Sequence, residues 1–466
     1  MSAVPCVFLS AVTFYLSIGL GDIWWLVWLA PIPILWLALG QSKPSAVVVT
    51  AWLAYALGST NILRAYVGVL PISVLVLAIT GPALLFALAV LGTWQVHRRL
   101  GAIAALFAFA LLWAAVDFLV SLDSANGSVL TPAAATVAAP VLIQTASLVG
   151  FVGITFLLGA FSAGIALSLR THKSLPAIVG TALLLANALY GFIWISPPTG
   201  FLRVALVASD DKVGKNKSDD KPAAFAAIEA YVAEIEKLRS TRPALIVLPE
   251  NISRIAPEWR AEVDAKLAAT ATATQATLIV GFNTRIDEAQ RNVALAFTPG
   301  ATHPTNYAKR RLVPVLETTV FSPGTGPVVL ASGIAVEICK DMDFANMIRD
   351  DMVATKATLL AVPAWDFDQD RWSHARVAIL RSVENGVPMA RSARNGLLTL
   401  SDKYGRVVAV TNSAAGIRTL VGELPLSGPG GGTTYAKIGN AFGWLSCVLG
   451  TLLVGMSSWR RTTRIL

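Results

Sequence analysis

Three short segments of the sequence place a nucleophilic or charged side chain directly beside an apolar run. Cys339 follows the alternating apolar residues of ASGIAVEICKDMDF, and Glu250 ends the run LIVLPE. Lys309 lies in YAKRRLVPVLE, in which Glu317 follows eight residues later. A thiol needs a base to become a thiolate, and the oxyanion of an acyl-transfer reaction needs a fixed cation or amide donors. A glutamate, a lysine and a cysteine therefore make a complete set for acyl transfer.

Each of these side chains also has a simpler interpretation. A lone cysteine is often a small core residue, and Glu250 and Lys309 taken singly would more often be solvated charges. The cysteine count narrows the choice for the thiol, because three cysteines are too few for a disulfide framework and Cys6 and Cys447 lie inside apolar runs. We therefore expect Cys339 to be a free thiol at the end of a strand.

The region around these residues alternates between strand and helix patterns, which favours a layered α/β fold. Segments of helical length and periodicity are Ala223–Leu238, Glu258–Ala271 and Ser373–Asn385. Active sites of α/β proteins collect at strand ends, so this fold would bring the candidate residues together. Short β-type runs are expected at Val204–Val207, Leu245–Leu248, Thr277–Val280, Val293–Phe297, Ala335–Ile338, Leu359–Val362 and Leu397–Leu400.

The composition places the chain in a membrane. Of its 466 residues, 55% are hydrophobic and 14% are charged, and the mean hydropathy is +0.63. An ordinary soluble domain is about 25% charged. We expect a bundle of about seven transmembrane helices at residues 1–196, a polar domain at 197–437, and a final helix with a basic tail at 438–466. The predicted spans are Ala3–Leu20, Ile23–Leu39, Ala46–Leu63, Val67–Trp94, Ala102–Leu122, Val141–Leu169, Leu175–Ile195 and Ile438–Met456, and Gly-rich Ser427–Thr434 would tether the polar domain to the last one.

Basic residues in the loops predict the orientation of the chain. Lys43, Arg98–Arg99, Arg170 with Lys173, and the arginines of the tail follow spans two, four, six and eight. Both termini are therefore expected in the cytoplasm and the polar domain outside it. The net charge of +9 is spread without a dense tract, so we expect contact with the lipid bilayer and its acidic headgroups and no binding of nucleic acid.

Two other groups of charged residues are expected to be structural. Asp117 lies inside the fifth span, where a carboxylate is costly, so it should face the bundle interior or lie near an interface. A structural partner is expected for it, and a role in a site is the alternative. Arg381 and Glu384 lie three residues apart in the predicted helix Ser373–Asn385 and are expected to pair on its surface.

The order and setting of the polar-domain motifs resemble the nitrilase, or carbon–nitrogen hydrolase, superfamily over residues 202–425. This resemblance implies an αββα sandwich in which Glu250 is the general base, Lys309 stabilises the tetrahedral intermediate, Cys339 is the nucleophile and Glu317 is a supporting glutamate. The matching features are Pro249-Glu250, Asn292, YxKxxLVPxxE, the strand that reaches Cys339, Trp365, Trp372-Ser-His374, Arg381–Gly396 and the turn Asp402–Arg406.

Soluble nitrilases have no membrane bundle, and the whole architecture resembles the apolipoprotein N-acyltransferases of bacterial envelopes. PVLIQTASLVGFVGITFLL, Trp113 with Asp117, and TTYAKIGN resemble helical motifs of that family. The resemblance implies a multi-pass protein of the bacterial cytoplasmic (inner) membrane with a periplasmic catalytic domain. Such a protein moves a fatty acyl group from a phospholipid through a cysteine thioester to an amine, most often the N-terminal diacylglyceryl-cysteine of a lipoprotein.

Departures from that family leave other substrates open. The family usually has Tyr-Glu after its cysteine, where this chain has Lys340 and Asp341. These two residues, with Trp365 and His374, are expected to support the site or contact substrate, and the amine acceptor could differ. A membrane-tethered amidase, in which water resolves the thioester, is the main alternative, and a non-catalytic scaffold is another. The histidines are scattered and the sequence contains no P-loop or dinucleotide fingerprint, so neither a metal nor a cofactor is expected.

Overall fold

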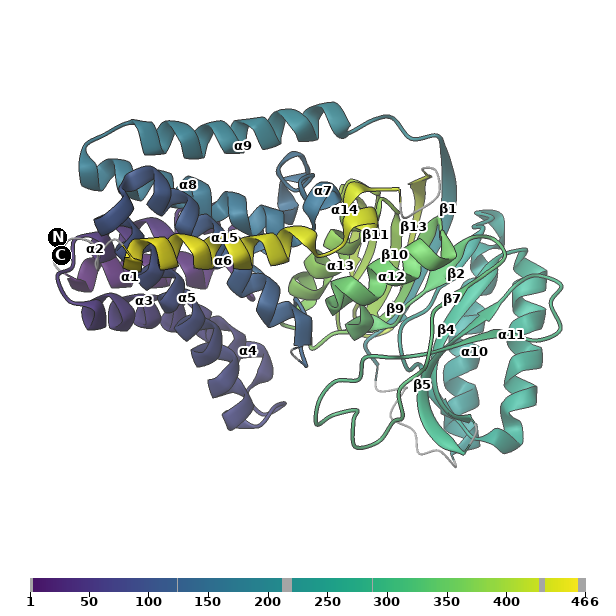
Figure 1. The fold of residues 1–466 in the computed structure, drawn as a ribbon. Helices are drawn as coiled ribbons and strands as arrows, with labels where there is room; N and C mark the ends of the chain where they lie inside the picture. The colour runs from purple at the N-terminus through teal and green to yellow at the C-terminus, as the bar shows by residue number, and fades with distance from the viewer. Residues whose placement is uncertain (1–2, 124, 212–219, 287, 427–431, 460–466) are drawn as a thin grey trace. The chain divides into compact units, whose positions relative to one another are not determined.

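The computed structural model describes residues 3–123, 125–211, 220–286, 288–426 and 432–459. The chain forms two compact units, Met1–Ser196 with Ile438–Leu466, and Pro197–Lys437. The described part of the first unit is helical, and the second contains two β-sheets with their helices (Figure 1). Most of the predicted tether Ser427–Thr434 lies outside the described residues.

Apolar helices of membrane-spanning length make up the helical unit. Two shorter apolar segments, α1 (Ala3–Ser17) and the combined η1 and α2 (Trp24–Leu39), lie where the first two spans are predicted. With six longer segments they confirm the predicted fold class of about eight helices for the described part of the chain. The six are Pro44–Tyr66 (α3, η2 and α4), α5 (Ile72–Leu100), α6 (Ala102–Asp123), α8 (Phe151–Thr171), α9 (Leu175–Trp194) and α15 (Ala441–Trp459).

Two predicted spans have other boundaries in the structure. The fourth is the single helix α5, which begins at Ile72 and contains Pro82, rather than Val67–Trp94. The sixth, predicted from Val141, begins only at Phe151, because Gly150 has a φ of 78° and ends the preceding short helix α7 (Ala146–Val149). A left-handed residue cannot continue an α-helix, so the apolar run is divided at this glycine.

The other unit contains two sheets within its described residues. The first has the strand order β13-β1-β2-β4-β5-β6, with β3 beside β4, and the second has the order β12-β11-β10-β9-β8-β7. The first sheet comprises β1 (Gly200–Ser209), β2 (Leu245–Val247), β3 (Ser253–Ile255), β4 (Thr277–Ile286), β5 (Ala289–Phe297), β6 (Thr305–Ala308) and β13 (Ile417–Leu426). The second comprises β7 (Val328–Val329), β8 (Ile334–Val336), β9 (Leu359–Trp365), β10 (Met389–Arg394), β11 (Leu397–Ser401) and β12 (Val407–Asn412).

The sheets pack face to face with helices on their outer sides. Val247 of the first sheet shares an apolar core with Val336 and Ala361 of the second. Helices α10 (Lys221–Lys237) and α11 (Arg260–Thr274) cover the first sheet, and α12 (Ala345–Thr355) packs on α13 (Arg371–Asn385), which contacts strands of the second. Parallel strands such as β2, β8 and β9 are covered on both faces, which explains their continuous apolar runs. The predicted αββα sandwich is confirmed.

Local sequence signals set the ends of the helices. The Asp220 carboxylate accepts a hydrogen bond from Ala223 N at 3.1 Å and begins α10, with Pro222 in its first turn. Gly386, with a φ of 69°, ends α13 after Asn385.

Candidate active site

Glu250 lies three residues beyond the end of β2 and is held against both sheets. Its main-chain N–H donates to Ala364 O of β9 at 3.2 Å, and its side chain is buried. Gly281 of β4 runs directly behind it. A Cβ at Gly281 would lie 2.5 Å from Pro249 O and 2.6 Å from Glu250 Cα, so only glycine allows this close approach.

Lys309 follows β6 and is 1% exposed. Its ammonium lies between two carboxylates, 2.8 Å from Glu250 Oε1 and 2.8 Å from Glu317 Oε2. Asn292 completes the cluster, because its Nδ2 donates to Glu250 Oε1 at 2.5 Å and to Glu317 Oε1 at 2.9 Å. The Asn292 main-chain O also accepts from Lys309 N at 2.9 Å. Glu250, Lys309 and Glu317, which the sequence predicted to act together, thus lie in one buried hydrogen-bonded cluster.

Cys339 lies on a sharp turn rather than on a strand. The prediction of a strand through Ile338 is wrong at its end, because β8 stops at Val336. Cys339 has a φ of 43° and opens the 3₁₀ helix η8 (Cys339–Asp343). This region of φ is sparsely populated by residues with a side chain, and such residues cluster at active sites. The partly exposed thiol donates to Trp365 O, with 3.4 Å between Sγ and O.

Asp341 connects the cysteine turn to the lysine segment. Its Oδ1 accepts from the main-chain N–H groups of Arg310 at 3.2 Å and Arg311 at 2.8 Å. Its Oδ2 accepts from Ile338 N at 3.1 Å, and the Tyr307 hydroxyl lies 2.8 Å from the same oxygen. Asp341 is fully buried. Its carboxylate therefore fixes the position of one loop against the other.

Burial and the neighbouring charges shift the pKa of each ionisable group of the cluster. Burial, and next the negative charge of Glu250, raise the pKa of the Cys339 thiol well above its ordinary value, against the opposing effect of Lys309. Burial also raises the pKa of Glu250. Burial alone would lower the pKa of Lys309, but the charges of Glu250 and Glu317 hold it well above its usual range. Burial alone would raise the pKa of Glu317, but the positive charge of Lys309 lowers it below its ordinary value.

These directions define the resting state of the site. The lysine is a permanent cation, Glu317 is ionised, and the cysteine is a neutral thiol that needs a base. The raised pKa of Glu250 makes it a stronger base than an ordinary glutamate.

A second buried ion pair lies in the electrostatic environment of the thiol. Arg391 of β10 donates to both oxygens of Asp366, at 2.6 and 3.0 Å, and both side chains are almost fully buried. Both charges act on the pKa of Cys339, Asp366 raising it and Arg391 lowering it. No sequence motif pointed to this pair, although Asp366 directly follows Trp365 and Arg391 lies within the matched Arg381–Gly396 segment.

The remaining candidates lie in structural contacts. Lys340 is buried, and its Nζ is 3.4 Å from Asp343 Oδ2. His374 Nε2 lies 2.9 Å from Asp370 Oδ2; burial alone would lower the pKa of His374, but the Asp370 charge raises it to about 9. The Trp365 ring lies 4.4 Å from the Arg394 guanidinium. Within the described residues, no three His, Cys, Asp or Glu side chains form a group that could hold a metal ion.

The predicted pairing of Arg381 with Glu384 is confirmed, but its predicted surface position is wrong. Arg381 Nε lies 3.2 Å from Glu384 Oε2, and both side chains are 0% exposed. Residues of every face of this part of α13 are buried. A helix covered on all sides carries its charges inward, where they must be paired.

Comparison with known proteins agrees with this geometry. The fold and the cluster define a carbon–nitrogen hydrolase domain, and residues 203–424 match the family model described as carbon-nitrogen hydrolase. Residues 10–164 match the model of the apolipoprotein N-acyltransferase N-terminal domain. The chain belongs to the apolipoprotein N-acyltransferase family, a membrane-embedded branch of the nitrilase superfamily.

Curated relatives and solved structures are similar to parts of this chain. An apolipoprotein N-acyltransferase of Geobacter metallireducens is 24% identical over 357 residues, which cover 69% of this chain and 68% of that protein. One from Rickettsia prowazekii is 23% identical over 66% of this chain and 67% of that protein. Among solved structures, an amidase from Nesterenkonia sp. is 19% identical with a TM-score of 0.39, covering 48% of this chain and 91% of its own. Nit3 from Saccharomyces cerevisiae is 18% identical with a TM-score of 0.40, covering 50% and 92%.

Proposed function

We propose that this protein transfers a fatty acyl group from a phospholipid, through a thioester on Cys339, to the N-terminal amine of a diacylglyceryl-cysteine lipoprotein. The observation that carries the proposal is the position of the Lys309 ammonium, 2.8 Å from each of two buried carboxylates, with a free thiol close enough for its pKa to depend on both Glu250 and Lys309. The same chain carries helices that can span a membrane, where an acyl donor is present.

In the first half-reaction Glu250 takes the proton of the Cys339 thiol while Sγ attacks the ester carbonyl of the phospholipid. The carbonyl oxygen becomes an oxyanion, and the Lys309 ammonium stabilises its charge. The carbon–oxygen bond then breaks. The proton held by Glu250 passes to the leaving alkoxide, which departs as a lysophospholipid and leaves the thioester.

In the second half-reaction the acceptor amine attacks the thioester carbonyl. Glu250 takes the amine proton, and Lys309 again stabilises the oxyanion. The carbon–sulfur bond breaks, the thiolate regains the proton from Glu250, and the amide product leaves. Glu317 and Asn292 hold Lys309 and Glu250 in place throughout, through the contacts described above.

The proposal assigns residues 1–196 and 438–466 to the bacterial cytoplasmic membrane and residues 197–437 to the periplasmic side. Packing within the bundle supports this orientation. The Trp94 indole donates to Gln41 O at 3.0 Å, and the Arg98 guanidinium lies 4.8 Å from the Trp94 ring. Arg170 lies 5.5 Å from the Trp36 ring. The basic ends after spans two, four and six therefore meet at one end of the bundle, as the positive-inside rule requires of a cytoplasmic face.

The amidase alternative is not favoured, because the curated relatives are named apolipoprotein N-acyltransferases and an N-terminal domain of that family matches residues 10–164. The amidase alternative rested on Lys340 and Asp341 after Cys339, and the buried positions of these two residues weaken that argument. These two residues stand where the family usually has Tyr-Glu, yet both are buried and lie in internal contacts of the domain.

The test is mass spectrometry of purified variants incubated with phospholipid and then with a diacylated lipopeptide. Cys339→Ala should abolish the acyl adduct, whereas Cys447→Ala, a matched control in α15, should keep it. Glu250→Gln should slow both half-reactions by about 10²–10⁴-fold. Lys309→Ala should slow them by about 10²–10³-fold. Adduct formation in Cys339→Ala at the wild-type rate would refute the assignment.

A further inference from the structure

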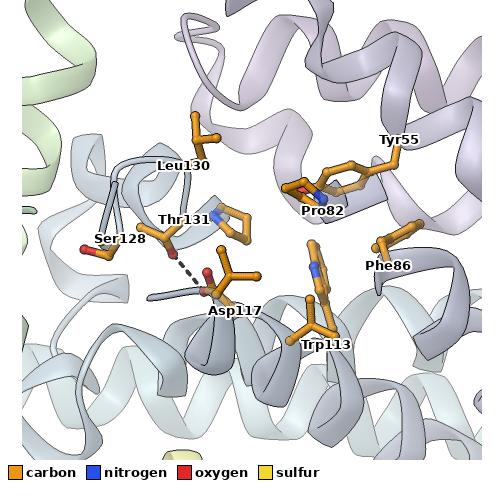
Figure 2. Close-up of a pocket in the computed structure, with 12 residues that line it drawn as sticks. Tyr55, Pro82, Phe86, Trp113, Asp117, Ser128, Leu130 and Thr131 are labelled. Carbon is orange, nitrogen blue, oxygen red and sulfur yellow. Dashed lines mark hydrogen bonds between the residues drawn. The ribbon is translucent and has the colours of Figure 1, made fainter. Parts of the chain in front are cut away.

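The helical unit contains a buried carboxylate, Asp117 of α6, on the wall of a small cavity (Figure 2). The hydroxyls of Thr131 and Thr155 donate to its Oδ2 at 2.8 and 2.5 Å, and Figure 2 shows Thr131 beside it. Asp117 therefore has structural partners inside the bundle, as the sequence predicted. These two donors are neutral side chains, whereas the buried carboxylate of Asp366 in the other unit is paired with a cation.

The Asp366–Arg391 pair is built into the second sheet. Asp366 directly follows β9, which runs parallel to β10, the strand that carries Arg391. The Asp366 main-chain N–H donates to Arg394 O at 3.0 Å. A Cβ at Gly396 would collide with Asp366 Oδ2, so only glycine leaves room for this carboxylate. Arg391 and Asp366 are 1% and 0% exposed, so solvent ions do little to screen their charges.

The strand that leads to Asp366 also holds the nucleophile. The main-chain O of Trp365, the last residue of β9, accepts a hydrogen bond from the Cys339 thiol at 3.4 Å. Asp366 is the next residue, and its two oxygens hold the Arg391 guanidinium. The ion pair is therefore attached to the same piece of backbone that orients Sγ.

Charged groups act on the thiol from both sheets. Glu250 and Lys309 follow strands of the first sheet, and Asp366 and Arg391 belong to the second. Burial raises the pKa of Cys339 most and Glu250 raises it next; of the second-sheet charges, Asp366 raises it and Arg391 lowers it. The two charges of the pair thus have opposite effects on the thiol and partly offset one another.

The helix α13 brings two further charged groups to the pair. Asp370, directly before this helix, lies 2.9 Å from His374 through Oδ2 and Nε2. Both act electrostatically on Asp366, and Asp370 also acts on Arg391. Because the pKa of His374 is raised to about 9, His374 is a cation at pH 7.5. At that pH the charges around the pair are therefore fixed.

We propose that Arg391 and Asp366 are positioning residues that set the reactivity of Cys339. The Arg391 guanidinium stabilises the thiolate, and Asp366 holds the guanidinium in place and limits this stabilisation. Both act through Cys339 and not through contact with substrate. The thiolate forms when the thiol loses its proton and again when the thioester breaks, so the pair serves both half-reactions. That last step rests on the proposed function, whereas the effect on the thiol does not.

The test is the rate at which iodoacetamide alkylates Cys339 in the full-length protein at pH 7.5. The rate is read from the mass of the Cys339 peptide, so Cys6 and Cys447 do not contribute. Alkylation requires the thiolate and no acyl donor. Asp366→Asn should raise the rate and Arg391→Gln should lower it. A pKa change of about one alters the thiolate population about tenfold, and the opposing change in nucleophilicity leaves about threefold in each rate.

The opposite signs separate this role from a structural one. Loosened packing around the thiol would change the rate in the same direction in both variants. Arg391→Lys keeps the positive charge and should keep the wild-type rate. Arg381→Ala breaks a buried ion pair on α13, so it controls for lost stability and should also keep that rate.

A second pair of variants covers the case in which a single substitution prevents folding. Leaving one partner of a buried ion pair alone is costly, whereas neutral partners of similar shape are tolerated. Asp366→Asn/Arg391→Lys and Asp366→Asn/Arg391→Gln differ only in the cation, and the first should react faster.

Equal rates in Asp366→Asn and Arg391→Gln, or changes of the same sign in both, would overturn the proposal. Equal rates in the two double variants would overturn it as well. No phospholipid takes part in the alkylation, so failure of this proposal and failure of the proposed acyl transfer are separate results.

Discussion

Removing the Lys309 charge should destabilise the protein in a way that depends on pH. The ammonium lies between Glu250 and Glu317, and all three groups are largely or fully buried. Lys309→Met leaves two buried carboxylates that still share Asn292 as a donor. Removing one partner of a buried ion pair costs about 3–5 kcal/mol. For a unit of this size each kcal/mol lowers Tm by roughly 2–4 °C, so we expect a decrease of about 10 °C.

The sign of the pH dependence follows from the two carboxylates. Without Lys309 the largest effect that lowers their pKa is lost and only hydrogen bonds such as those from Asn292 still lower it, so burial and mutual repulsion should raise the pKa of at least one carboxylate above its unfolded value. A carboxyl group with a raised folded pKa contributes stability below its unfolded pKa and loses it as pH rises toward the folded pKa, by up to about 1.4 kcal/mol per pH unit. The deficit of the variant should therefore be larger at pH 8 than at pH 5.5.

The assay is thermal unfolding of the detergent-solubilised protein at both pH values. Lys266→Met is the matched control, because Lys266 pairs with Glu229 at the surface, where such a pair is worth about 0–1 kcal/mol. Lys309→Met with Glu317→Gln should recover part of the loss, since one carboxylate is then neutral. A Lys309→Met protein with the Tm of the Lys266→Met control at pH 8, or a smaller deficit at pH 8 than at pH 5.5, would refute the reasoning.

Three further predictions follow from the structure. The rate of adduct formation should fall as pH falls through the raised pKa of Glu250, with a midpoint above the ordinary value of about 4.3; a pH–rate profile with a midpoint below that value would contradict it. Arg381→Ala should lower thermal stability by about 3–5 kcal/mol, because it leaves Glu384 buried without its ion pair, while leaving adduct formation per folded molecule intact; loss of acylation in an equally stable variant would contradict this. A reporter active only outside the cytoplasm should be active when fused near Ser209, and activity after Leu466 instead would reverse the proposed orientation.

Sequence patterns located the strands that are continuous apolar runs. Leu245–Val247 and Leu359–Trp365 are buried on both faces, so their apolar runs were visible without any alternation. The strands β12 (Val407–Asn412) and β7 (Val328–Val329) were not predicted, although each pairs with the neighbouring strand along the chain. The two residues of β7 are too few to show a periodic pattern. The sixth span was placed too early because its apolar run continues through a turn that only the φ of Gly150 reveals.

The sequence predicted part of the candidate site, because several of its residues lie beside apolar runs. Glu250, Lys309 and Glu317 could be named because each lies beside a recognisable apolar run, and the fold brings them into one cluster. The left-handed turn at Cys339 and the Asp366–Arg391 pair could not be derived from local pattern. Both depend on how the second sheet places residues that are far apart in the sequence.

The central claim is that a phospholipid acylates Cys339 and that an amine, not water, removes the acyl group. The most direct measurement is the intact mass of the wild-type protein after incubation with phospholipid, followed by peptide mapping and by addition of a diacylated lipopeptide. We predict a mass increase of one acyl group located on Cys339, which the lipopeptide removes much faster than buffer does. An adduct on any other residue, or one that water clears as fast as the lipopeptide, would contradict it.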